Sequence, residues 1–151
     1  MTLFTSMFMH AGWLHIAGNM LYLWIFGDNV EDNFGHIKFL VFYLICGLAA
    51  TFSQMAFNMH SEIPNLGASG AIAGVLGAYI LMFPRAQVRV LMGRAVVPMP
   101  ALIVLGFWIA LQFFSGVGSI MTQTDAGVAY MAHIGGFVTG FILTFFLRKR
   151  S

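Results

Sequence analysis

The sequence predicts an all-α, polytopic membrane helix bundle, and its composition and charge pattern are the observations behind that prediction. Of its 151 residues, 60% are apolar and only 8% are charged. A soluble domain carries roughly 45–50% apolar and about 25% charged residues, so this chain has too few charges to cover a water-facing surface. Disorder is excluded too, because it requires low hydrophobicity and high charge. A single cysteine excludes a disulfide framework and a cysteine-based zinc site.

The charged residues divide the chain into five uncharged stretches of 27, 23, 22, 30 and 22 residues. A helix needs about 20 apolar residues to cross the hydrocarbon, so each stretch can hold one span. We therefore expect one membrane domain over residues 1–151. Its five spans are expected at roughly 11–27, 39–59, 69–83, 96–115 and 127–147. The stretches are too long, and too uniformly apolar, for the strands of a barrel.

The basic residues indicate the direction of these spans. All seven lie between the first and second spans, between the third and fourth, or after the fifth. The positive-inside rule makes that side cytoplasmic, with the C-terminus inside and the N-terminus outside. We expect a multi-pass protein of a bacterial plasma (inner) membrane. An outside N-terminus with no export signal also leads us to expect one further helix before residue 1.

Polar side chains at membrane depth are expensive and are therefore functional candidates. His15 and Asn19 are four residues apart, on one face of the first span. Ser69 opens the third span, and His133 lies early in the fifth. Only 13 apolar residues follow the Ser69 turn, about 20 Å of helix, so Ser69 should lie some 10 Å below the outer surface. The first, third and fifth spans therefore bring these side chains to one level.

Each of these residues also has a packing interpretation. Serine and glycine are common at helix contacts in membranes, and a lone histidine or asparagine often bonds a neighbouring helix. Gly136 and Gly140 form a small-xxx-small pair. A second glycine series follows 3-4-3 spacing: Gly67, Gly70, Gly74 and Gly77. The agreement of the polar residues in depth and side favours a site.

The chemistry of the candidates indicates acyl transfer. A serine hydroxyl needs a base, and His133 is the natural one for Ser69. The positive end of a helix dipole would favour charge at Ser69. His15, Asn19 and the Ser69 backbone N–H are candidate donors for an oxyanion. The acidic residues lie outside the membrane in the expected topology, so we predict a Ser–His dyad. Zincin and nucleophile-elbow signatures are absent from the sequence.

These residues resemble the motifs of the rhomboid family of intramembrane serine proteases. The matching segments are His10-x4-His15-x3-Asn19, Glu31-x3-Gly35, Gly67-Ala68-Ser69-Gly70, and Ala132-His133-Ile134-Gly135-Gly136 with Gly140. Their order and spacing match over almost the whole chain. The resemblance implies a rhomboid-like fold with five of the six core transmembrane helices, the first helix and first outer loop being absent from this sequence.

The resemblance also implies the roles of individual residues. Ser69 is the nucleophile, His133 the base, and His15 and Asn19 oxyanion donors. The supporting residues are His10 in the hydrogen-bond network, Gly67 and Gly70 in the serine loop, Glu31 in the cytoplasmic loop, and Gly136 and Gly140 in helix packing. The implied partners are transmembrane protein substrates and the lipid bilayer, with no cofactor, metal or nucleic acid.

One departure and two alternatives remain. Some bacterial members place an aromatic residue four positions after the serine, whereas this chain has Ala73 there, so another side chain must support His133. An inactive rhomboid-like protein that binds membrane clients is one alternative. A metal or proton transporter is the other, using His10, His15, His60 and His133. It is disfavoured because no intramembrane carboxylate accompanies these histidines.

Overall fold

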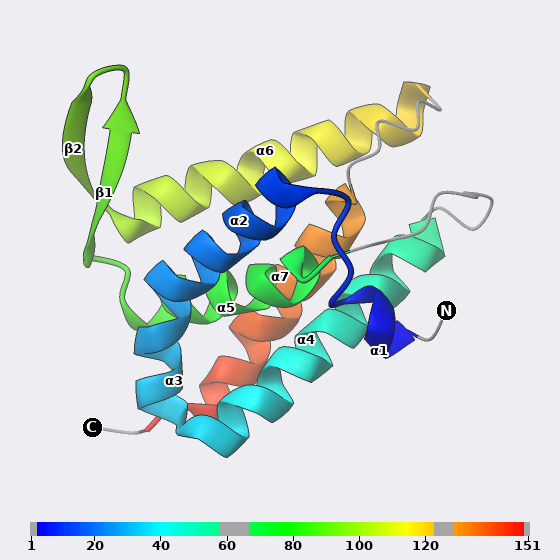
Figure 1. Ribbon diagram of the computed structural model, residues 1–151, viewed down its shortest axis with the longest axis horizontal. Coiled ribbons are helices and arrows are strands. Elements are labelled where there is room, and N and C mark those ends of the chain that lie inside the picture. Colours follow the sequence, from blue (N-terminus) through cyan, green and yellow to red (C-terminus); the bar gives the residue numbers. More distant parts are fainter. Residues whose placement is uncertain (1–2, 58–66, 123–128, 150–151) are drawn as a thin grey trace.

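A computed structural model describes residues 3–57, 67–122 and 129–149, and most of them are helical. Figure 1 shows the elements in chain order. They are α1 (Leu3–Ser6), α2 (Trp13–Tyr22), the π-helical turn η1 (Leu23–Gly27), α3 (Asp28–Phe34), α4 (His36–Phe57), α5 (Ser69–Met82), β1 (Gln87–Met92), β2 (Ala95–Pro100), α6 (Ala101–Thr122) and α7 (Tyr130–Leu147).

Three helices, α4, α6 and α7, are long and apolar enough to cross a membrane. Helix α5 is apolar but has only 14 residues, or about 21 Å of helix. Eleven consecutive residues of α5, 70–80, are buried, which places it inside the bundle. A helix that is apolar on all sides is typical of such a central position. The predicted helical membrane bundle is confirmed.

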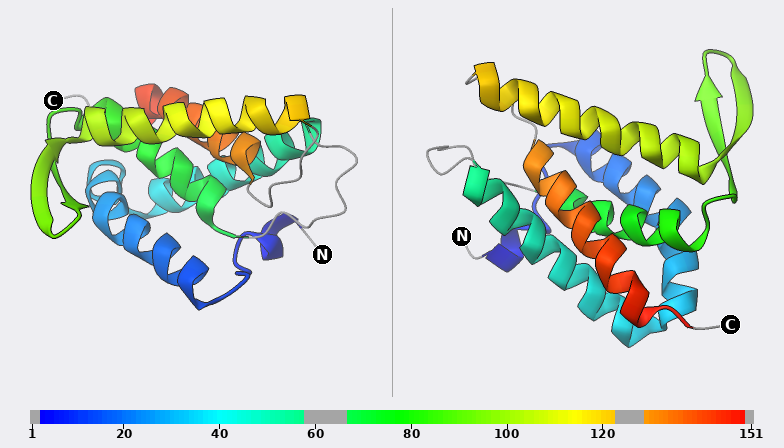
Figure 2. Two further views of the ribbon diagram at one scale, coloured as in Figure 1. Left: turned by 90° about the horizontal axis from the view of Figure 1, so that it is seen from above. Right: turned by 180° about the vertical axis from the view of Figure 1, so that it is seen from behind.

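Helices α4, α5 and α7 pack against one another and form the centre of the molecule. Helix α6 packs mainly on α7, and η1 packs on α5. The left view of Figure 2 shows α6 along one side of this centre and α2 along the other. In Figure 1, α2, α5 and α7 run in one direction, while α4 and α6 run in the other. The first turns of α5 and α7 therefore lie toward the same side of the molecule.

Glycines set the close approach of α5 and α7. A Cβ added at Gly136 would collide with the carbonyl oxygen of Gly70, and one at Gly140 with the carbonyl oxygen of Gly74. The backbones of the two helices thus touch at two successive turns. Membrane helices associate through this kind of small-residue packing, since lipid supplies no hydrophobic drive between them.

The fourth expected span, 96–115, differs from the structure. Residues 96–100 belong to an antiparallel β-hairpin that turns at Gly93, whose φ is +63°, and α6 begins only at Ala101. Prolines at 98 and 100 lack the N–H that a helix interior requires. A short apolar run does not distinguish strand from helix by hydropathy, which explains the difference. The expected end of the second span and start of the fifth lie outside the described residues.

The described basic residues belong to three parts of the chain that lie toward the left in Figure 1, namely the start of α4, the β-hairpin with the segment before it, and the end of α7. They are Lys38 in the first turn of α4, Arg85, Arg89 and Arg94 in the segment from the end of α5 through the β-hairpin, and Arg148 and Lys149 after α7. The Lys149 N–H donates to Asn33 Oδ1 at 3.1 Å, and its ammonium donates to the Asp32 carbonyl at 3.2 Å. These two contacts join the segment after α7 to the end of α3. The Lys149 ammonium is favourable there because a cation is stabilised at the C-terminus of a helix.

Candidate active site

Ser69 and His133 meet where α5 and α7 begin. Ser69 is the first residue of α5, and His133 lies in the first turn of α7. The Ser69 Oγ lies 3.0 Å from His133 Nε2, within hydrogen-bond distance. Nucleophilic catalysis requires this spacing between a hydroxyl and its base. The contact between Gly70, the residue after Ser69, and Gly136, about one turn after His133, holds the two helices at the necessary separation.

His15 and Asn19 of α2 face Gly67, two residues before the serine. Gly67 has a φ of +113°, and a Cβ built there would lie 2.8 Å from His15 Cε1 and 3.7 Å from Asn19 Nδ2. A side chain at position 67 would therefore fill the space between α2 and the serine. Asn19 is only 8% exposed, and its Nδ2 is buried without a hydrogen-bond partner among the described residues. An N–H donor is thus available beside Gly67, two residues before the serine.

The orientation of the His15 ring follows from its neighbours. The Ala11 N–H donates to His15 Nδ1 at 3.3 Å. A neutral imidazole that accepts at Nδ1 carries its proton on Nε2, the nitrogen that would lie 3.0 Å from a Cβ at Gly67. His10 packs edge-on against His15, with ring centroids 5.2 Å apart. His10 therefore contacts the ring of His15.

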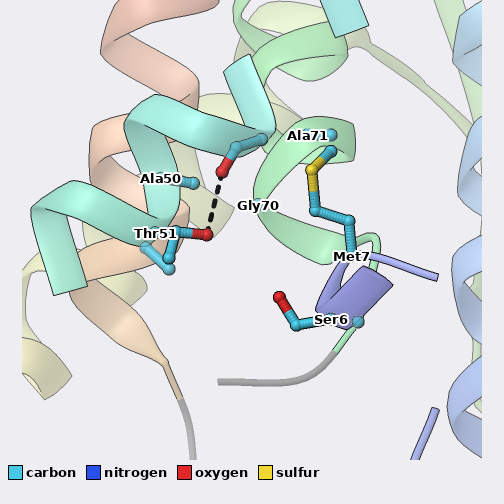
Figure 3. A pocket seen from close by; sticks show the side chains of 9 residues that line it. Ser6, Met7, Ala50, Thr51, Gly70 and Ala71 are labelled. Atoms are coloured by element: carbon cyan, nitrogen blue, oxygen red, sulfur yellow. Dashed lines mark hydrogen bonds between the residues drawn. The ribbon is translucent and has the colours of Figure 1, made fainter. Parts of the chain in front are cut away.

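The N-terminal segment braces the backbone that leads into Ser69. The Gly67 N–H donates to the carbonyl of Ser6 at 2.9 Å. Met7 is buried, and its side chain extends between α4 and α5 toward Ala71, beside a small pocket (Figure 3). A Cβ at Gly47 would collide with the end of the Met7 side chain, so Gly47 makes room for it.

Two contacts of His133, and one contact that joins α4 to α7, were not predicted. Gln112 Oε1 lies 2.7 Å from His133 Nδ1, and the Trp108 ring lies 5.8 Å from the His133 ring, centroid to centroid. Gln54 Oε1 accepts the Ala132 N–H at 3.1 Å, at the start of α7. Gln112 is a polar residue inside an apolar stretch, and the rule that singles out polar groups at membrane depth applies to it equally.

Comparison with known proteins identifies the family. A family model described as Rhomboid domain matches residues 1–150. The chain belongs to the rhomboid family. Similar proteins include RHOMBOID-like protein 1 of Arabidopsis thaliana, 33% identical over 95% of this chain and 33% of that protein. Rhomboid protease GluP of Bacillus subtilis is 33% identical over 92% of this chain and 24% of that protein.

A third rhomboid relative is Rhomboid protein 1, mitochondrial, of Saccharomyces cerevisiae. It is 30% identical over 95% of this chain and 41% of that protein. The chain therefore spans less than half the length of each of these three relatives. The family identity supports an integral membrane protein with a rhomboid-like bundle, in agreement with the apolar helices.

Other predicted residues of this rhomboid domain are packing residues or lie at a distance from the site. Gly70 belongs to the first turn of α5, where a Cβ would meet Ala50, so it is a packing residue of the helix rather than part of the loop before it. Glu31 lies at the opposite end of the bundle and pairs with His36 at 2.7 Å. His60, Glu62 and Asp125 lie outside the described residues. Within the described ranges, no three His, Cys, Asp or Glu side chains are grouped to hold a metal.

Proposed function

We propose that this rhomboid domain is an intramembrane serine endopeptidase that cleaves transmembrane helices of membrane proteins near the outer face. The observation that carries the proposal is the 3.0 Å distance between Ser69 Oγ and His133 Nε2, at the first turns of two adjacent apolar helices. Family membership supports it, because one relative is named a protease.

The mechanism follows ordinary acyl transfer. Ser69 Oγ attacks the scissile carbonyl carbon while its proton passes to His133 Nε2. The C–N bond then breaks, and the same proton passes to the leaving amine. Water attacks the resulting ester, giving one proton to Nε2 and its hydroxyl to the carbonyl carbon. The Ser69 oxygen takes the proton back as it leaves.

The developing oxyanion requires donors on the α2 side of the serine. The buried Asn19 Nδ2 and the His15 Nε2–H both face Gly67. The Ser69 N–H is one of the first-turn N–H groups that a helix leaves without an internal partner. Donors fixed in place before reaction stabilise charge without reorganisation, and removing one costs about 10²–10³-fold in a soluble protease.

The depth of Ser69 determines the substrate class. Helix α5 covers about 21 Å of a roughly 30 Å core, so Ser69 lies below one surface of the bilayer. A helical substrate keeps its carbonyls in i→i−4 hydrogen bonds and must unwind locally to present one. We infer that substrates have transmembrane helices with a weak first turn near the outer face. The basic side of the molecule, with the C-terminus, then faces the cytoplasm.

A proteoliposome assay tests this proposal. The protein is reconstituted with a single-span reporter whose first membrane turn carries Gly and Ala, and cleavage is followed by mass spectrometry. We expect Ser69→Ala and His133→Ala each to abolish cleavage while both variants still insert. The double variant should be hardly worse than either single one, because nucleophile and base act as a unit. Cleavage near the wild-type rate in Ser69→Ala would contradict the mechanism.

The same assay separates the client-binding alternative. A non-cutting rhomboid-like protein would retain the reporter in detergent pull-downs and release no fragment from wild type. The short distance between the serine and histidine favours the protease, because a pure binding role does not require the pair to meet.

A further inference from the structure

Helix α6 supplies two side chains that hold the imidazole of His133. Gln112 Oε1 lies 2.7 Å from His133 Nδ1, on the opposite side of the ring from Ser69. The Trp108 ring lies 5.8 Å from the His133 ring at an angle of 41°. Residues 108 and 112 are four apart, so they lie on one face of α6, one turn from each other. Both ring nitrogens of His133 thus have defined neighbours, and the Trp108 ring lies beside the imidazole.

The chemistry of the two hydrogen bonds determines the required tautomer. To accept the proton of Ser69, Nε2 must be unprotonated, so a neutral ring must carry its proton on Nδ1. An amide oxygen only accepts hydrogen bonds, so Gln112 Oε1 pairs with Nδ1–H. The bond to Gln112 therefore stabilises the one neutral form in which His133 can act as a base toward Ser69.

We propose that Gln112 is the positioning residue of the site, fixing the tautomer and ring orientation of His133 from helix α6. The inference rests on the proposed protease function and extends it. In soluble triads a carboxylate fills this role. At membrane depth an ionised carboxylate is expensive to bury, whereas a neutral amide offers the same acceptor without a charge.

The contacts from α6 also explain how His133 is supported although no aromatic residue lies four positions after the serine. Ala73 occupies that position and is fully buried, with no side chain large enough to cover the imidazole. Trp108 comes from the neighbouring helix instead, and its ring also approaches Phe137, at 6.4 Å between centroids. In this chain, therefore, α6 supplies the aromatic neighbour of His133, whereas in the family members with an aromatic residue four positions after the serine the serine's own helix supplies it.

A purely structural role for Gln112 makes a different prediction. Polar side chains often join membrane helices, and the Gln112–His133 bond joins α6 to α7. Removing such a bond would lower stability, and activity would fall only as the folded fraction falls. A positioning role instead predicts a fall in the rate of Ser69 acylation in protein that remains folded.

The test uses four variants of the full chain. Gln112→Met keeps the length and flexibility of the side chain but removes the acceptor. Gln112→Asn keeps an amide on a shorter arm that does not reach Nδ1. Gln112→Glu keeps an acceptor at the original reach. Gln54→Met is the matched control, because it also removes one glutamine hydrogen bond to α7, at the Ala132 N–H, without touching the imidazole.

Two measurements are made on each variant in detergent. One is the rate of Ser69 labelling by a fluorophosphonate probe, and the other is the thermal unfolding midpoint. The kinetics of reporter cleavage then show whether a loss of activity lies in kcat or in KM. We expect Gln112→Met and Gln112→Asn to label about 10- to 100-fold more slowly, since small misplacements of catalytic groups reach 10²-fold. The loss should fall on kcat.

The remaining variants decide between the two roles. Gln112→Glu should label much faster than Gln112→Met, and Gln54→Met should stay near wild type whatever its unfolding midpoint. Wild-type labelling in Gln112→Met, or equal losses in Gln112→Met, Gln112→Glu and Gln54→Met that follow the unfolding midpoint, would overturn the positioning role. Absence of labelling in the wild type would instead overturn the proposed protease function, so the two failures are distinguishable.

Discussion

Substituting Gly136 by alanine tests whether helix contact sets the catalytic distance. The new Cβ would collide with the Gly70 carbonyl oxygen, a backbone atom that cannot rotate away. An ordinary carbon–oxygen contact needs about 3.3 Å, so α5 and α7 must separate by about 1 Å at this level. The Ser69–His133 distance, 3.0 Å in the structure, would then exceed the hydrogen-bond range.

Both stability and activity should change. Overpacking of a tight contact costs about 1–3 kcal/mol, and a misplacement of about 1 Å between catalytic groups costs up to about 10²-fold in rate. Thermal unfolding in detergent measures the first effect, and fluorophosphonate labelling of the folded protein at a temperature well below the transition measures the second. We expect the labelling rate to fall by much more than the folded fraction.

Gly106→Ala is the matched control for this substitution. It makes the same chemical change inside helix α6, where a new Cβ would meet nothing within 4 Å. Gly106→Ala and Gly136→Ala therefore both gain about 1 kcal/mol in helix propensity, but only Gly136→Ala places a Cβ against the neighbouring helix. If Gly136→Ala labels and unfolds like Gly106→Ala, the argument from helix contact is wrong.

Other predictions address the oxyanion donors and the topology. Asn19→Ala should slow reporter cleavage by about 10²–10³-fold without lowering the unfolding midpoint, since Nδ2 has no partner to lose among the described residues; a wild-type rate would remove Asn19 from the site. Gly67→Ala should lower both stability and activity, because its φ of +113° costs most residues about 1–3 kcal/mol and the new Cβ meets His15; retention of both would contradict the close approach. Arg94→Cys, in a Cys46→Ser background, should react with an impermeant maleimide only from the cytoplasmic side, and labelling from outside would reverse the topology.

Much of the fold followed from composition and charge. An apolar helix that crosses a membrane needs a known length, so the long charge-free stretches predicted apolar helices. The third expected span, 69–83, lies close to the bounds of α5, Ser69–Met82. The level shared by Ser69 and His133 followed from counting residues inward from one side. Their 3.0 Å separation did not, because it depends on the contact between Gly70 and Gly136 across two helices.

The remainder could not be predicted from the sequence alone. The second strand of the hairpin occupies residues 95–100, so α6 begins only at Ala101. The hydropathy of such a short apolar strand does not differ from that of a helix segment, so the sequence did not reveal it. The partner of His133 Nδ1 is Gln112, 21 residues earlier in the chain, and only helix packing determines which face of α6 turns toward the imidazole. Ala73 indicated that some side chain must replace the missing aromatic residue, but not which one.

The most direct test of the account is the site of covalent labelling. The protein in detergent is treated with a fluorophosphonate, digested, and the modified residue is located by mass spectrometry. We predict modification at Ser69 in the wild type and its loss in His133→Ala. Labelling of a different serine, no labelling of folded protein, or equal labelling in His133→Ala would contradict a nucleophile activated by this histidine.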